Sequence, residues 1–126
     1  MICHSEKKTN MTLNEYQQKA LETAFYPKEY KVIYPALGLT GEAGEVADKV
    51  KKTIRDTVIM TDANGSIILP ENKRVELAKE VGDVLWYIAT LAHDIGFTLE
   101  EIGQMNYEKL HSRQQRGMLG GSGDNR

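Results

Sequence analysis

Apolar residues recur at intervals of three and four along the middle of this chain, from Leu39 to Ile54. That spacing places them on one face of an α-helix. We therefore expect a long helix that begins at Tyr34 or Pro35, since proline suits the first helical position, and ends near Asp56. A helix of this length indicates a chain built mainly from helices.

The most apolar stretch of the chain follows it and predicts a second long helix, from Pro70 to about Ile95, ahead of Gly96. Its apolar positions are Leu77, Val81, Val84, Leu85, Trp86, Ile88, Leu91 and Ile95. They cover a broad part of the helix surface, which indicates contacts on more than one side, a partner subunit being one candidate.

Two shorter helices are predicted by capping boxes, in which a threonine and a glutamate three residues later cap a helix start reciprocally. The box at residues 12–15 opens a helix that runs to about Phe25, and the box at residues 98–101 opens one that ends near Arg113. Between the long helices, residues 57–69 hold two apolar triplets around an Asn-Gly turn, which is typical of a short hairpin. We expect an all-α fold with a four-helix core, a helical bundle, plus this hairpin.

The composition is that of a single soluble domain. The 126 residues carry a net charge of −2, which argues against an extended nucleic-acid surface, since such surfaces need a marked basic excess. No apolar run approaches the roughly 20 residues that span a bilayer, and the opening residues lack the apolar stretch of a signal peptide. We expect a cytoplasmic protein with a flexible leader at residues 1–11, one domain at residues 12–116 and a glycine-rich tail at residues 117–126.

Four carboxylates stand in two short pairs, Glu42 with Glu45 and Glu80 with Asp83, one pair on each long predicted helix. Residues three apart lie on the same helical face, so two helices packed side by side would aim all four groups into one volume. Such like charges repel unless a divalent cation neutralises them, and Mg²⁺ takes oxygen ligands of this kind together with substrate phosphates. The two pairs therefore predict a metal site that serves phosphate chemistry.

An ordinary solvated helix face is the alternative for each acid pair, because such acidic patterns are common there. Glu45 can also form an ion pair with Lys49, four residues later on the same helix. At about 100° per residue, Glu42 and Glu45 fall beside an apolar face whose centre lies near Ala43 and Val50. The acids are thus expected at the margin of the helix pair, where a cleft would form.

Three glycines, Gly38, Gly41 and Gly44, bracket the first acid pair inside a predicted helix. Each costs about 0.5–1 kcal/mol relative to alanine. Close approach of another helix or of a ligand would offset that cost, and tight helix packing without a ligand is the alternative.

Asn106, Lys109 and Arg113 form one stripe on the last predicted helix. Their amide, ammonium and guanidinium groups can hold a polyphosphate. The alternative is a solvated helix end, where basic side chains are favoured by the helix dipole.

These motifs together resemble those of the MazG-like nucleoside triphosphate pyrophosphohydrolases, which belong to the all-α NTP pyrophosphatase group. The resemblance covers roughly residues 12–116, and the glycine-rich ending resembles the tails of small single-domain members from phages and bacteria. The matching motifs are Gly-Glu-Ala-Gly-Glu-Val at residues 41–46, Lys51-Lys52, Glu-Val-Gly-Asp-Val at residues 80–84, Asn-Tyr-Glu-Lys-Leu at residues 106–110, and Arg113.

The resemblance implies hydrolysis of a nucleoside triphosphate to the monophosphate and pyrophosphate, with Mg²⁺ as cofactor and Mn²⁺ as a substitute. It implies metal-binding and catalytic roles for the four acids, Glu42, Glu45, Glu80 and Asp83. It also implies phosphate contacts for Lys49, Lys52, Asn106, Lys109 and Arg113. Family members assemble as homodimers or homotetramers, and a phage-encoded member would act in the host cytoplasm.

Other functions remain open at this point. Within the same enzyme group, the chain could be selective for dCTP or dUTP, or could act on phosphoribosyl-ATP. Outside it, the chain could be a non-catalytic helical interaction module whose acids bind a structural ion. Nucleic acid and membranes are not expected partners.

Overall fold

The computed structural model describes residues 10–124. In chain order the elements are α1 (Leu13–Leu21), the 3₁₀ turn η2 (Lys28–Tyr30), α2 (Ile33–Asp56), β1 (Met60–Thr61), β2 (Ile67–Ile68), α3 (Glu71–Asp94) and α4 (Leu99–Gln115). The four helices and the hairpin are confirmed, and the one sheet in the described part has two short strands. Most of the predicted leader, residues 1–9, and the end of the predicted tail, residues 125–126, lie outside the described residues.

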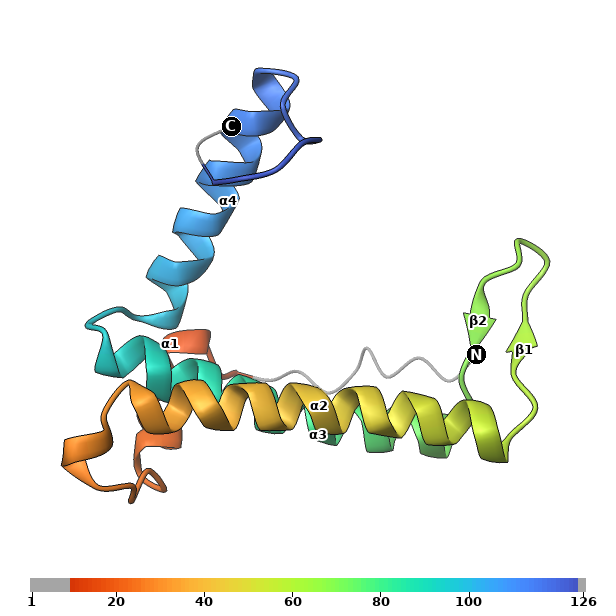
Figure 1. The fold of residues 1–126 in the computed structure, drawn as a ribbon, viewed down its shortest axis with the longest axis horizontal. Coiled ribbons are helices and arrows are strands. Elements are labelled where there is room, and N and C mark those ends of the chain that lie inside the picture. The colour runs from red at the N-terminus through yellow and green to blue at the C-terminus, as the bar shows by residue number, and fades with distance from the viewer. Residues whose placement is uncertain (1–9, 125–126) are drawn as a thin grey trace.

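The framework is the antiparallel pair α2 and α3, which lie side by side along their length (Figure 1). The hairpin joins them at one end, with Met60 opposite Ile68 and Thr61 opposite Ile67. Within its turn, the Asp62 carboxylate accepts hydrogen bonds from two backbone N–H groups further along the turn. At the other end of the pair, α1 packs against α3. This pairing decides which acidic residues meet.

Thr12 and Thr98 cap α1 and α4 as predicted, but only the second capping box is reciprocal. The Thr12 hydroxyl accepts the Glu15 N–H at 3.1 Å without a return bond from the Glu15 side chain, whereas at α4 the box formed by Thr98 and Glu101 is complete. The α2 helix begins at Ile33, slightly before the predicted start. The predicted end of α1 at Phe25 is wrong, because the helix stops at Leu21. Beyond it the backbone hydrogen bonds shorten to three-residue spacing, as the chain turns toward α3.

The buried core lies where α1, α3 and the start of α4 meet, and its apolar members are Ala20, Ala89, Ala92 and Leu99. Gln17 is only 1% exposed and ties the three elements together. Its amide nitrogen donates to the carbonyls of Ala89 at 3.1 Å and Phe97 at 3.0 Å, and its oxygen accepts the Leu99 N–H. Each of these polar atoms is satisfied, which is what makes a buried amide tolerable.

The apolar face of α2 is largely uncovered in the single chain. The sequence predicted that the centre of this face, near Ala43 and Val50, packs against another helix, and that prediction is wrong for one chain. Ala43 is exposed, and Val50 and Ile54 are 40% and 62% exposed. The buried residues of α2 are Pro35 and Thr53. The correction arises because helical periodicity identifies an apolar face without identifying what covers it.

A closed bundle of four helices is not formed by one chain. α4 contacts α1 and α3 near its first residues and then extends away from the α2–α3 pair (Figure 1). Most of its side chains are exposed. Among the described residues, no helix combines the length and the apolar character needed to cross a membrane.

Candidate metal centre

Three of the four predicted acids meet across the α2–α3 pair. Glu42 of α2 and Glu80 and Asp83 of α3 each offer a carboxylate oxygen, and these oxygens lie within 4.8 Å of one another. Glu42 and Glu80 are partly buried and Asp83 is exposed. The i,i+3 spacing and the antiparallel packing therefore produce the convergence that the sequence predicts. We refer to these three residues as the acid cluster.

The acid cluster holds its negative charges at an electrostatic cost. The pKa of Glu42 is raised, first by burial and then by the neighbouring charges of Asp83, Glu80 and Glu45. Burial and like charges both disfavour the ionised form. A cation bound among these oxygens would reverse the effect, since it supplies the opposite charge that the site lacks.

Glu45, the fourth predicted acid, stands outside this cluster and is exposed. It lies three residues along α2 from Glu42, close enough to act on the Glu42 pKa. A carboxylate in this position is open to water, while its neighbours converge.

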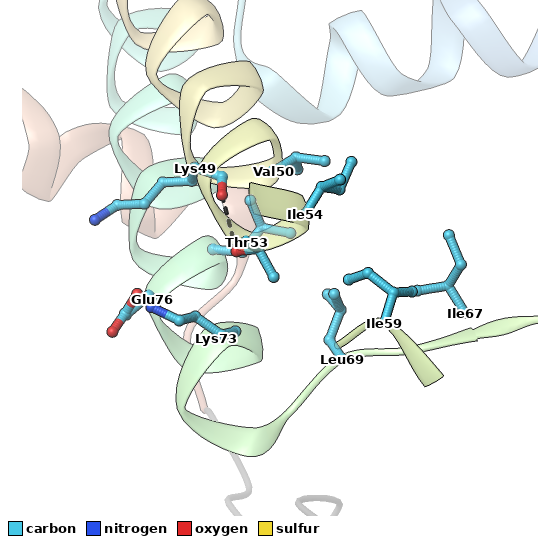
Figure 2. A pocket seen from close by; sticks show the side chains of 10 residues that line it. Lys49, Val50, Thr53, Ile54, Ile59, Ile67, Leu69, Lys73 and Glu76 are labelled. Atoms are coloured by element: carbon cyan, nitrogen blue, oxygen red, sulfur yellow. Dashed lines mark hydrogen bonds and ion pairs between the residues drawn. The ribbon is translucent and has the colours of Figure 1, made fainter. Parts of the chain in front are cut away.

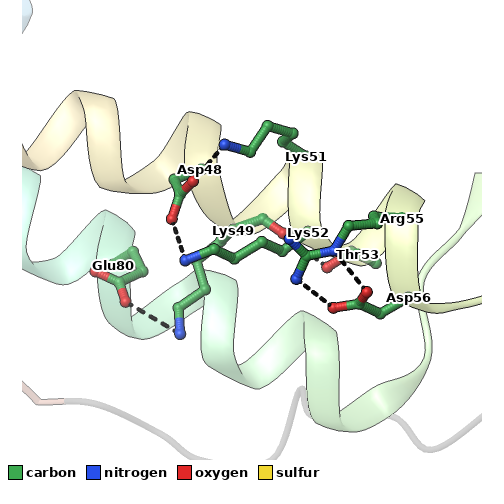
Figure 3. A network of polar contacts seen from close by, with 8 residues as sticks. All are labelled: Asp48, Lys49, Lys51, Lys52, Thr53, Arg55, Asp56 and Glu80. Atoms are coloured by element: carbon green, nitrogen blue, oxygen red, sulfur yellow. Dashed lines mark hydrogen bonds and ion pairs between the residues drawn. The ribbon is translucent and has the colours of Figure 1, made fainter.

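Lys49 reaches across to α3, where its Nζ lies 3.6 Å from Oε1 of Glu80 (Figure 3). The same-helix pairing with Glu45 that the sequence allows is replaced by this contact between helices. Lys49 therefore brings a positive charge to the edge of the acid cluster, where a phosphate group would also be attracted.

Lys52 is held on α2 by Asp48, with 2.5 Å between Nζ and Oδ2 (Figure 3). The Asp48 pKa falls to about 2, first through the hydrogen bond from Lys52 and then through Lys51. In the described conformation, Lys52 is thus paired within its own helix and does not contact the acid cluster.

The predicted basic stripe of α4 lies apart from the acid cluster, because α4 leads away from the α2–α3 pair (Figure 1). Asn106 is exposed, and the Lys109 Nζ lies 3.4 Å from the Asp124 carboxylate. Arg113 is 4% exposed, and its Nη2 donates to the Asp124 carbonyl at 2.9 Å and to that carboxylate at 3.2 Å. Within one chain, the structure does not bring this stripe and the acids together.

Tyr87, which the sequence places beside Glu80 and Asp83 at the border of the apolar face of its helix, packs against Gly38. A Cβ atom at Gly38 would lie 2.1 Å from Cε1 of the Tyr87 ring, whereas Gly41 and Gly44 have nothing that a Cβ would meet within 4 Å. The close approach expected of the glycines is thus found at Gly38. Burial raises the Tyr87 pKa, and so do Tyr34, Glu42 and Asp83, which places the ring beside the acid cluster.

A separate apolar cavity of about 320 Å³ lies under the hairpin. Figure 2 shows the side chains of Val50, Ile54 and Ile67 facing it, while the charged ends of Lys49, Lys73 and Glu76 point away. The cavity therefore offers no charged group for binding phosphate.

Comparison with known proteins places these features in a family context. The family model described as the MazG nucleotide pyrophosphohydrolase domain matches residues 35–118, a range that contains every predicted site residue. The Gene 37 protein of Mycobacterium phage L5 is 43% identical over 122 residues, covering 92% of this chain and 100% of that relative. No solved structure matches. The resemblance found in the sequence motifs is confirmed.

Proposed function

The chain belongs to the MazG nucleotide pyrophosphohydrolase domain family, and on that premise we propose that it hydrolyses nucleoside triphosphates to the monophosphate and pyrophosphate with Mg²⁺. The observation that carries the proposal is the convergence of Glu42, Glu80 and Asp83 within 4.8 Å. Oxygen donors from carboxylates are what Mg²⁺ prefers, and its usual companions are substrate phosphates. The donor set thus fits the cofactor, and Mn²⁺ accepts the same ligands.

Glu42, Glu80 and Asp83 would hold the metal ion. When bound, Mg²⁺ supplies positive charge that neutralises the negative charge of the triphosphate and the charge that develops on the leaving group. Glu45, exposed and next to the acid cluster, would orient a water molecule and accept its proton as the water attacks the anhydride between the α and β phosphorus atoms. The new phosphorus–oxygen bond forms at the attacked phosphorus as its bond to the bridging oxygen breaks, and the monophosphate and pyrophosphate separate.

Lys49 would meet the substrate phosphates, since it already lies at the edge of the acid cluster against Glu80. Lys52 would also contact the phosphates after breaking its ion pair with Asp48. That ion pair is exposed, and exposed ion pairs contribute little to stability. Asn106, Lys109 and Arg113 of α4 would also contact phosphate. The phosphate would first have to displace the Asp124 carboxylate, which accepts hydrogen bonds from Lys109 and Arg113.

We also propose that the chain acts as a homodimer or homotetramer. Leu37, Val50 and Ile54 of α2 and Val81 of α3 expose large apolar side chains on the two framework helices. Extended exposed apolar surface marks a protein interface. In such an assembly, α4 of one copy would be free to approach the acid cluster of another.

The test is a panel of ribo- and deoxynucleoside triphosphates with Mg²⁺ or Mn²⁺, with the products separated by ion exchange. Monophosphate and pyrophosphate are the expected products. Nucleoside diphosphate and inorganic phosphate would reject the proposed cleavage. The panel also distinguishes a broad enzyme from one selective for dCTP, dUTP or phosphoribosyl-ATP.

Glu80→Gln with Glu76→Gln as a matched control tests the acid cluster. Both residues lie on α3, one helical turn apart, and Glu76 pairs with Lys73 outside the cluster. We expect Glu80→Gln to lose turnover and Glu76→Gln to keep it. Calorimetry tests the alternative of an interaction module, which would show no Mg²⁺-dependent nucleotide binding.

A further inference from the structure

An aromatic pocket of about 330 Å³ lies between the connector from α1 to α2, the first turn of α2, and α3. Four of its six lining residues are aromatic: Phe25, Tyr26, Tyr34 and Trp86, with Thr23 and Pro27 completing the wall. The proposed phosphate chemistry assigns no role to these side chains. We call this feature the aromatic pocket.

Most of the wall is held rigidly by hydrogen bonds and ring stacking. The indole N–H of Trp86 donates to the Thr23 hydroxyl at 2.9 Å, and the Tyr26 hydroxyl donates to the Asp94 carboxylate at 2.8 Å. Tyr26 stacks on Tyr34, with 4.9 Å between ring centroids and 16° between ring planes. Groups fixed in this way bind a ligand without a large loss of side-chain freedom.

The same Asp94 carboxylate also holds a strained part of the connector. It accepts the N–H of Val32 at 2.9 Å, and Val32 adopts a φ of 68°. A positive φ is rare for a β-branched residue and persists only where the surroundings enforce it. Asp94 therefore fixes both the backbone of the connector and the Tyr26 ring that the connector carries.

Phe25 differs from the other three rings, because its side chain is 87% exposed. No ring contact joins it to another aromatic residue in the described part of the chain. A large apolar ring exposed at the rim of an aromatic pocket is suited to cover a flat ligand from one side.

The aromatic pocket lies close to the acid cluster. Trp86 follows Asp83 by three residues on α3, so the two side chains share one face about 5–6 Å apart at Cβ. The Tyr87 ring stands next to Trp86, with 4.9 Å between centroids, and fills the space over Gly38. A nucleotide with its phosphates at the acid cluster can therefore extend its sugar and base along this face into the aromatic pocket.

We propose that the aromatic pocket binds the base of the nucleotide substrate by stacking, and that it discriminates little among bases. The proposal rests on the proposed function for the position of the phosphates. Stacking on aromatic rings tolerates every base, because each has a π-face.

Weak discrimination follows from how the polar side chains of the pocket are used. The Thr23 hydroxyl donates to the Ala20 carbonyl and accepts from Trp86, and the Tyr26 hydroxyl is engaged by Asp94. Strong discrimination requires buried polar groups that one base satisfies and another leaves unpaired. Rings that stack, with hydroxyls already committed elsewhere, do not supply that.

Trp86 provides the readout, because it is the single tryptophan of the chain and lines the aromatic pocket. With Mg²⁺ present, its fluorescence is titrated with adenosine and cytidine monophosphates, and pyrophosphate binding is measured by calorimetry. Phe25→Ala removes the exposed ring, and Tyr30→Ala is the matched control, an exposed aromatic of the same connector outside the pocket. Hydrolysis of triphosphates by the three proteins is followed in parallel.

We expect saturable quenching by both monophosphates, with Kd values within about tenfold of each other. Phe25→Ala should raise both Kd values about tenfold and leave pyrophosphate binding unchanged, while Tyr30→Ala changes neither. Absence of saturable quenching, an equal effect of Phe25→Ala on pyrophosphate, or an equal effect of Tyr30→Ala overturns the proposal. A preference above about 100-fold for one base overturns its second part.

The two proposals fail separately. If both monophosphates bind and Phe25→Ala weakens them, but no triphosphate is hydrolysed, the base site stands and the proposed function is rejected. If triphosphates are hydrolysed and Phe25→Ala leaves KM unchanged, the proposed function stands and the base site is rejected.

Discussion

Gly38→Ala is the sharpest test of how α2 and α3 pack beside the acid cluster. The added Cβ would lie 2.1, 2.4 and 2.5 Å from three atoms of the Tyr87 ring. Carbon atoms in contact are normally about 3.5–4.0 Å apart, so the ring must retreat by more than about 1 Å. Trp86 and Tyr34 stand on its flanks, with ring centroids 4.9 and 6.5 Å away. The retreat therefore disturbs packing on both sides.

The magnitude follows from two opposing terms. Replacing a glycine inside a helix by alanine stabilises it by about 1 kcal/mol. Forcing extra volume into a packed site costs about 1–3 kcal/mol. Gly41→Ala and Gly44→Ala carry only the first term, because a Cβ at either position meets nothing within 4 Å. We expect Gly38→Ala to be less stable than these two controls by about 1–3 kcal/mol, since the helix term cancels in the comparison.

The assay is equilibrium unfolding in urea, followed by far-ultraviolet circular dichroism at one fixed protein concentration for all variants. A fixed concentration matters because any self-association contributes to apparent stability. Combining Gly38→Ala with Tyr87→Leu gives a double-mutant cycle, in which the cost of the alanine should disappear once the ring is gone. Equal stabilities of the three alanine variants would refute the packing reasoning.

Three further outcomes test the site and its surroundings. Glu80→Gln and Asp83→Asn should each reduce kcat/KM at least about 100-fold, because each removes a charged metal ligand; a steady-state assay checks this. Without metal, Asp83→Asn should leave the free energy of unfolding in urea equal or raise it, because a like charge is removed, whereas Glu80→Gln also loses its ion pair with Lys49. Mg²⁺ at about 100 times its Kd should raise the free energy of unfolding of the native chain by about 2.7 kcal/mol, measured by calorimetric melting. If Mg²⁺ stabilises Glu80→Gln by the same amount, the ion does not bind at the acid cluster. Burial, together with the hydrogen bond to Asp94, raises the pKa of Tyr26 to about 12 from 10.0. The neutral Tyr26 hydroxyl therefore stabilises the fold fully below pH 10, and this stabilisation is lost as the pH rises to about 12. The difference in unfolding free energy between the native chain and Tyr26→Phe should therefore narrow across that interval, and a difference that stays constant in urea titrations would contradict the assignment.

The acid cluster shows how far spacing along the chain predicts a site. The i,i+3 pairs define which carboxylates share a helical face, and antiparallel packing then brings Glu42, Glu80 and Asp83 together as predicted. Glu45 lies outside the cluster, although its spacing from Glu42 matches that of Asp83 from Glu80. Spacing alone does not distinguish them, because the outcome depends on which flank of α2 faces α3.

The basic residues were harder to predict, because a long flexible side chain takes its partner from the tertiary neighbourhood. Lys49 pairs with Glu80 on the other helix. Arg113 is buried against Asp124, eleven residues further along the chain. Neither partner is marked by a sequence pattern.

The sequence by itself determined the properties that depend on one or two helical turns. These are the helix starts at Thr12 and Thr98, the hairpin after α2, and the alignment of each acid pair on its helix. Hydrogen bonds between near neighbours and the helical repeat are sufficient causes for all of them.

Only the tertiary structure decided which of these local elements meet. The early end of α1, the Tyr87 ring over Gly38 and the aromatic pocket at Trp86 all arise from contacts between residues far apart in the chain. The physical reason is that packing selects among faces that are locally equivalent. A contact between distant residues carries an entropic cost that no local pattern reveals, and it forms only where burial and hydrogen bonding across the whole fold outweigh that cost.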